Sequence, residues 1–122
     1  MIKIKQVTED LVTVLKSVNQ RTFPMLAKEG TSLPFITYER ISISPDNTKD
    51  GAQNMHTSFQ VNIVSKEYIQ GVELLDNIIY QVTRMNSKYD LLHRVTIAGA
   101  SEEAFDDGYA QTLSIDINTS LA

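Results

Sequence analysis

The segment from Thr57 to Ile63 constrains the fold most, because apolar and polar residues alternate along it. One side of an extended chain carries Thr57, Phe59, Val61 and Ile63, and the other side carries Ser58, Gln60 and Asn62. Alternation with a period of two is typical of a β-strand that has one face on a core and the other toward solvent. Such a strand requires a sheet with one covered face, and another structural layer has to cover it.

Two segments repeat their apolar residues at helical spacing instead. The first lies between Gln6 and Gln20 and has apolar residues at Val7, Leu11, Val14, Leu15 and Val18. The second runs from about Lys66 to Met85 and has them at Ile69, Val72, Leu75, Ile78, Ile79, Val82 and Met85. Each pattern predicts an amphipathic α-helix with one face available to cover a sheet. Thr8 is the predicted N-cap of the first helix, and Ser65 is that of the second.

Further alternating or β-branched runs predict four more strands. They are a short edge strand or extended segment within Thr22–Ala27, and longer strands over Leu33–Pro45, Leu91–Ala98 and Tyr109–Asn118. Turn-forming residues predict an exposed, mobile loop over Pro45–Gly51 and an acidic loop over Gly99–Gly108.

The order of these elements, α-β-β-β-α-β-β, predicts an α+β fold. We expect a mostly antiparallel sheet of four to five strands with both helices packed on one face. At 122 residues the chain is long enough for one ordinary domain and too short for two, so residues 1–122 are predicted to form a single domain.

The formal net charge of −4 is unevenly distributed along the chain. Residues 1–61 hold seven Lys/Arg against six Asp/Glu, whereas residues 62–122 hold four against nine. Because no basic stripe follows a phosphate backbone, nucleic-acid binding is disfavoured. No apolar run has the length of a signal peptide or of a bilayer-spanning helix, so we expect a soluble protein, made in the cytoplasm, with no membrane partner.

Motifs for catalysis or cofactor binding are absent from the sequence. Without cysteine there is no disulfide, thiolate metal site or cysteine nucleophile. His56 and His93 lie on different predicted strands without ligand-like spacing, so no metal site is predicted. The five glycines are too scattered for a phosphate cradle, and no serine lies in a nucleophile elbow. We therefore predict no catalytic residue and no cofactor, and expect that the protein is not an enzyme.

Two clusters of acidic and amide side chains have two interpretations. One comprises Glu102, Glu103, Asp106 and Asp107, and the other comprises Asp46, Asn47 and Asp50. Each could supply paired carboxylates for acid–base chemistry or oxygen ligands for a divalent cation. A solvated loop explains the same residues without a ligand and is the favoured interpretation.

The polar faces of the two central strands are a further candidate surface. Tyr38, Arg40, Gln60 and Asn62 are predicted to lie there, either exposed to solvent or in contact with another subunit. Polar-faced sheets can assemble side by side, and a heterologous contact that closes on itself makes a ring.

Several segments resemble those of a known protein family. They are Phe23-Pro24 after the first helix, Leu33–Glu39 entering the second strand, the Lys49–Gly51 loop, Phe59–Lys66 leading into the second helix, and Tyr109–Ile117 at the end. Together they extend over nearly the whole chain. They resemble the family of phage tail completion and head-to-tail joining proteins, small α+β domains similar to the tail terminators of long-tailed phages. The matching residues are architectural, and none is catalytic.

This resemblance implies a structural protein of the virion tail or neck, from a bacteriophage or prophage and made in the host bacterial cytoplasm. Such a protein caps the finished tail tube and presents it to the head connector, commonly as a ring of six copies around the DNA channel. The implied partners are further copies of the chain, the tail tube and the head-connector proteins, while DNA passes nearby without specific binding.

Within this picture the Pro45–Met55 loop is the candidate assembly contact, because a long mobile loop can order on assembly. The residues concerned are Asp46, Asn47, Lys49, Asp50, Gly51 and Asn54.

The main alternative is a small-ligand-binding or enzymatic α+β domain of unknown substrate. It predicts a concave pocket with convergent polar groups and shifted pKa values. A ribosome- or nucleic-acid-associated domain is a third alternative, which the acidic balance weakens.

Overall fold

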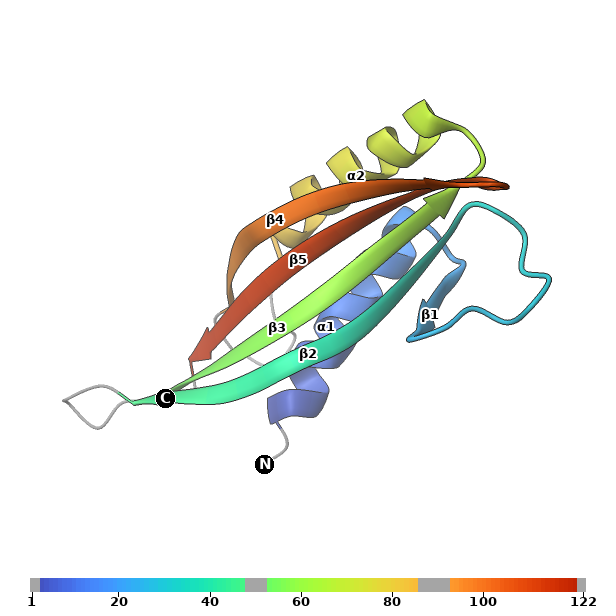
Figure 1. Cartoon of the computed structure of the whole chain (residues 1–122). Coiled ribbons are helices and arrows are strands. Elements are labelled where there is room, and N and C mark those ends of the chain that lie inside the picture. The colour runs from blue at the N-terminus through green and yellow to red at the C-terminus, as the bar shows by residue number, and fades with distance from the viewer. Residues whose placement is uncertain (1–2, 48–52, 86–92, 121–122) are drawn as a thin grey trace.

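A computed structural model describes residues 3–47, 53–85 and 93–120 of the chain. Its elements are α1 (Lys3–Val18), β1 (Thr22–Pro24), β2 (Phe35–Asn47), β3 (Gln53–Ser65), α2 (Tyr68–Val82), β4 (His93–Phe105) and β5 (Gly108–Ser120) (Figure 1). The predicted order α-β-β-β-α-β-β is confirmed. Of the two helices in the described ranges, neither is long and apolar enough to cross a membrane.

The strands form one sheet in the order β1-β2-β3-β5-β4. β1 pairs parallel to β2, and the other three pairings are antiparallel. Both helices lie on the same face, with α2 behind β4 and β5 and α1 behind β2 and β3 (Figure 1). The predicted α+β architecture, with two helices on one face of a mostly antiparallel sheet, is therefore confirmed.

The core lies between the helices and the two central strands. On the strands the buried side chains are alternate residues, Phe59, Val61 and Ile63 of β3 and Leu113, Ile115 and Ile117 of β5. The helices pack against them with Val7, Leu11 and Leu15 of α1 and Ile78 and Val82 of α2. Burying a side chain of this size contributes about 1.5–3 kcal/mol before conformational entropy is subtracted, so this layer is the main source of stabilisation.

Both predicted helix caps were wrong. α1 begins at Lys3, which places Thr8 inside the helix, where its hydroxyl donates to the Ile4 carbonyl 2.9 Å away, one turn back. α2 begins at Tyr68 with Glu67 as its N-cap, and no side chain caps it. The Ser65 hydroxyl instead donates to the Glu67 carbonyl at 2.9 Å and stabilises the corner between β3 and α2.

Both predicted loops are shorter than the turn-forming residues indicated. Pro45, Asp46 and Asn47 belong to β2 and pair with the first residues of β3. The run from Gly99 to Phe105 belongs to β4, and only Asp106 and Asp107 remain as the turn before β5. In each hairpin the opposite strand satisfies the backbone N–H and C=O groups, and this outweighs the local turn preference.

A β-bulge changes the face on which part of β2 lies. The register shifts between Arg40 and Ser42, so that Arg40 pairs with Phe59 and Ser42 pairs with Ser58. After the bulge, Ser42 therefore lies on the uncovered face with Ser58. Tyr38 and Arg40 precede the bulge, and they lie on the helix-covered side because they pair with the buried Val61 and Phe59. The prediction that these two residues lie on a polar face with Gln60 and Asn62 was therefore wrong.

Two glycines allow close packing around the corner at Ser65. A Cβ atom at Gly108 would overlap the Ser65 carbonyl oxygen, and one at Gly71 would lie 2.6 Å from the Ser65 Oγ. Gly108 is buried and begins β5, while Gly71 is buried within α2. The β4–β5 hairpin, the end of β3 and the start of α2 are thus packed directly on one another.

We expect Gly108→Ala to destabilise the fold by about 1–3 kcal/mol, the usual effect of an overpacked site. The added methyl group meets backbone, which cannot rotate away as a side chain can. Gly99→Ala is the matched control, because nothing lies within 4 Å of a Cβ at that position of the same hairpin. Urea unfolding followed by circular dichroism compares the two, and equal midpoints would contradict this packing.

Candidate functional site

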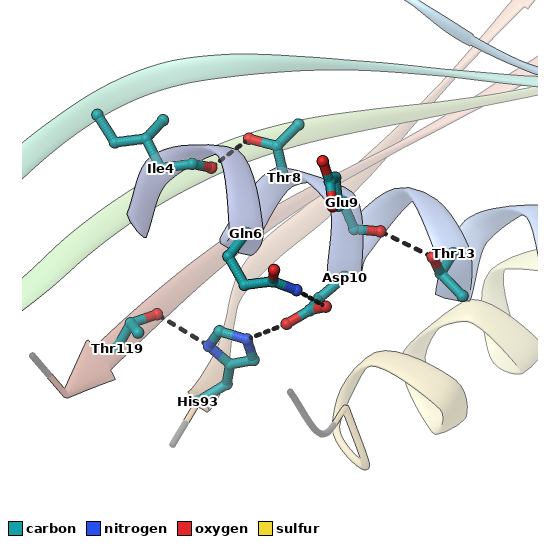
Figure 2. A network of polar contacts seen from close by, with 8 residues as sticks. All are labelled: Ile4, Gln6, Thr8, Glu9, Asp10, Thr13, His93 and Thr119. Atoms are coloured by element: carbon teal, nitrogen blue, oxygen red, sulfur yellow. Dashed lines mark hydrogen bonds and ion pairs between the residues drawn. The ribbon is translucent and has the colours of Figure 1, made fainter. Parts of the chain in front are cut away.

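A buried polar cluster joins α1 to the edge of the sheet. Gln6 and Asp10 lie one turn apart on α1, and the Gln6 amide donates to Asp10 Oδ1 at 2.6 Å. His93 begins β4, with its Nε2 2.7 Å from Asp10 Oδ2 and its Nδ1 2.9 Å from the Thr119 hydroxyl (Figure 2). Thr119 is the β5 residue paired with His93 in the sheet register, so the backbone ladder places the imidazole.

The cluster satisfies its own hydrogen-bonding groups. The side chains of His93 and Asp10 are 0% and 2% exposed, and the Asp10 carboxylate has Gln6 and His93 as partners. A His93 Nε2–H that donates to Asp10 leaves Nδ1 to accept from Thr119, so both ring nitrogens have a partner. A buried carboxylate is tolerated only with such partners, so the cluster holds the first half of α1 against β4 and β5.

The carboxylate, imidazole and hydroxyl of the cluster follow one another as in an acid–base relay. Unlike those of a catalytic relay, they are not accessible to a substrate. Thr119 is 0% exposed, so its hydroxyl has no surface from which to meet a substrate. This arrangement fits a structural role. Sequence reasoning missed the cluster, although Gln6 and Asp10, spaced four apart beside the apolar stripe of α1, were a signal for it.

The two histidines do not come together. His56 pairs with Ser44 and Asn118 on the face of the sheet turned away from the helices, whereas His93 reaches Asp10 on the helix side. Among residues 3–47, 53–85 and 93–120, no group of three His, Cys, Asp or Glu is placed to hold a metal ion.

We expect His93→Leu to destabilise the fold by about 3–5 kcal/mol, because it leaves the Asp10 carboxylate buried without its imidazole partner. The double variant Asp10→Leu/His93→Leu should cost less than the sum of the two single changes, since it removes both members of the pair. Urea unfolding measures all three variants.

The control for this cycle is Glu9→Ala, on the neighbouring residue of α1. The Glu9 side chain is 51% exposed and lies 3.7 Å from Lys5, so its loss should change the unfolding free energy by less than about 1 kcal/mol. A His93→Leu variant as stable as Glu9→Ala would rule out a stabilising role for the cluster.

The face of the sheet turned away from the helices is polar and half-exposed. Side chains on neighbouring strands bond across it, with Ser58 donating to Asp116 at 2.7 Å and Thr112 donating to Asn62 at 2.9 Å. Gln60 also lies on this face, as predicted together with Asn62. The face is therefore a polar surface, suited to water or to a polar protein contact.

The two lateral edges of the sheet lie on opposite sides of the molecule. β1 pairs with β2 only from Ile36 to Tyr38, and the remainder of β2 forms one edge. β4 forms the other edge along its whole length. Edges of this kind present backbone groups that can pair with another chain.

Apolar side chains are exposed at several of these places. The fractional exposure is 84% for Leu26 and 66% for Met25 after β1, 58% for Ile41 on the β2 edge, 61% for Ile69 on α2 and 45% for Phe105 at the end of β4. Ile69 was predicted on the apolar face of the second helix, and its exposure shows that this prediction was wrong, whereas Phe105 was predicted only as part of the acidic loop. Leu26 and Met25 follow Pro24 in a segment where Met25 has a φ of 61° and donates its N–H to the Tyr38 carbonyl at 2.7 Å.

The structure divides the predicted contact loop. Asp46 and Asn47 lie at the end of β2, and Asn54 lies near the start of β3, where it pairs with Asp46. Lys49, Asp50 and Gly51 lie outside the described residues. The role of this loop as an assembly contact stays a prediction.

No protein-family model matches the sequence, and neither does any curated protein. Among solved structures the chain is similar to one from the virion of a native gene transfer agent particle, with a TM-score of 0.69. The match covers 95% of this chain and 92% of that chain at 8% sequence identity. At this identity the likeness establishes a shared fold over nearly the whole of both chains.

Proposed function

We propose that the chain is a structural virion protein of a bacteriophage or prophage, which caps the tail tube or joins the tail to the head connector. It acts through protein–protein contacts as a ring of copies, and it is not an enzyme. The observation that carries this proposal is the likeness to a chain of a gene transfer agent virion over 95% of the sequence.

The surface of the fold supports the same proposal. A sheet with a free edge on each side offers two different surfaces for neighbouring copies, and a heterologous contact of this kind closes into a ring when the rotation permits. His93 and Asp10 form a buried pair, and we assign this pair a structural role and not a catalytic one.

The proposed location is the tail or neck of the virion, after synthesis in the host bacterial cytoplasm. The proposed partners are further copies of the chain, the tail tube and the head-connector proteins. A net charge of −4 per copy favours a ring that DNA passes without being held. Asp46, Asn47, Lys49, Asp50, Gly51 and Asn54 remain the proposed contact loop at the end of the β2–β3 hairpin.

The test is the mass in solution by light scattering over a range of protein concentrations, with and without tail tubes assembled from the tube protein of the same phage. We expect a closed oligomer, or capture of the chain at tube ends that electron microscopy can locate. A strict monomer that ignores tubes at every concentration would contradict the proposal and favour a small-ligand-binding domain.

A variant of the contact loop refines this test. Replacing Lys49 and Asp50 by serine should weaken assembly or tube capture and leave the unfolding midpoint unchanged, because the turn-forming sequence around them predicts an exposed loop. The control is Glu73→Ser with Asp76→Ser, two exposed positions on α2, which should leave both properties unchanged.

A further inference from the structure

The tip of the β4–β5 hairpin is acidic and carries an exposed aromatic ring. We call it the acidic tip, formed by Glu102, Glu103, Phe105, Asp106 and Asp107, all of which are exposed. The sequence has no Lys or Arg from Val95 to Ala122, and Arg94 lies at the end of the hairpin opposite to the four carboxylates. A half-exposed phenylalanine among carboxylates at the end of a strand has no role in the core.

The strand ends next to the turn are held firmly. Glu102 accepts hydrogen bonds from the Tyr68 hydroxyl at 2.9 Å and from the Gln111 amide at 3.2 Å. The hydrogen bond with Glu102, together with its charge, raises the pKa of Tyr68 above its usual value. The Tyr68 ring meets Tyr109 edge-on, with centroids 5.5 Å apart. Because Gly108 also packs on Ser65, the tip projects in a fixed direction and has little freedom to lose on binding.

A groove of complementary character lies between α1 and β2, and we call it the basic groove. Its apolar lining includes Ile4, Val12 and Tyr38, and its basic residues are Lys5, Lys16 and Arg40. Glu9 is its single carboxylate. The groove thus combines an apolar surface for an aromatic ring with an excess of positive charge.

We propose that the acidic tip of one copy docks in the basic groove of the next copy. Phe105 lies against the apolar lining, and Glu103, Asp106 and Asp107 face the basic residues of the groove. The occupant is a second copy of this chain because its own tip supplies the charge and the aromatic ring that the groove complements. This inference rests on the proposed function and specifies the contact through which copies of the ring join.

The positions of the two surfaces make the contact heterologous. The groove adjoins β2 and the tip belongs to β4 and β5, with β3 between them in the sheet. Each copy therefore offers its tip to one neighbour and its groove to the other. Repetition of one such contact closes into a ring when the rotation between copies permits.

The first test reverses the charges. The tip variant Glu103→Lys/Asp106→Lys and the groove variant Lys5→Glu/Lys16→Glu should each weaken association at least about tenfold at low salt. The four changes combined should restore most of the association. The matched control is Glu73→Lys/Asp76→Lys on exposed positions of α2, which changes the net charge as the tip variant does and should leave association unchanged.

The second test mixes the two defective variants. The tip variant retains a native groove for the native tip of the groove variant, and its reversed tip complements the reversed groove of that variant. We therefore expect a mixture to regain oligomers in light scattering, whereas each variant alone stays monomeric at the same concentration. A mixture that stays monomeric would overturn the proposal.

The third test is a disulfide, which is specific here because the chain has no cysteine. Asp107→Cys with Thr13→Cys places one thiol at the tip and one in the groove, and oxidation should yield a ladder of covalent oligomers. Asp107→Cys with Asp76→Cys is the control and should yield none. If the free chain is monomeric, the same double-cysteine variant is oxidised after it has bound to tube ends, and the disulfide-linked oligomers are looked for there.

The outcomes separate this inference from the proposed function. If the wild-type chain forms a ring or joins tubes while neither the charge reversal nor the disulfide has an effect, the docking proposal is wrong and the virion role stands. If the wild-type chain stays monomeric and ignores tubes, both proposals fail.

Discussion

Burial of one face of β3 and β5 is the constraint on which the rest of the structure depends. Phe59 and Ile115 alternate with polar neighbours along strands that are paired on both sides, so their apolar sides need a cover. Two amphipathic helices supply it, and both have to lie on the same face. The opposite face is then free to be polar, and its side chains bond across the strands, as Ser58 and Asp116 do. The layer structure and the uncovered surface have the same cause.

The cluster around Asp10 is the polar exception within the helix-covered layer. Its hydrogen bonds are directional, whereas the surrounding apolar contacts tolerate sliding and repacking. Asp10 has to meet His93, and His93 has to meet its β5 partner Thr119, so the position of α1 along the sheet is defined. That position also sets the groove between α1 and β2, because the same helix forms one wall of it.

The periodicity of the sequence predicted the order of elements and the side on which the helices lie. It did so because alternation along Thr57–Ile63 and helical spacing around Leu11 are properties of local sequence. The full lengths of β2 and β4 were not predicted, because Pro45 and Gly99 favour turns locally and are part of strands only when a partner strand pairs with them. The bulge after Arg40 could not be predicted for the same reason, because a register shift is a property of a pair of strands and not of one strand's sequence.

The site residues were harder to predict than the fold. His93 and Asp10 lie far apart in the sequence, and only the packing of α1 on the sheet brings them to 2.7 Å. The exposure of Phe105 depends on the length of β4, a strand that the sequence pattern predicted to end at Ala98. Single helices and strands can be predicted from local periodicity. Surfaces that several elements form together depend on tertiary structure and cannot.

The contact between Gly108 and Ser65 has a mechanical consequence. It ties the turn end of the β4–β5 hairpin to the end of β3, a central strand. β5 is paired along its length with β3 on one side and β4 on the other, so a pull on the hairpin along the strand direction loads many backbone hydrogen bonds in parallel. Peeling them one at a time would require a force across the sheet. Tension applied to the hairpin along its strands is therefore shared with the central strands of the sheet.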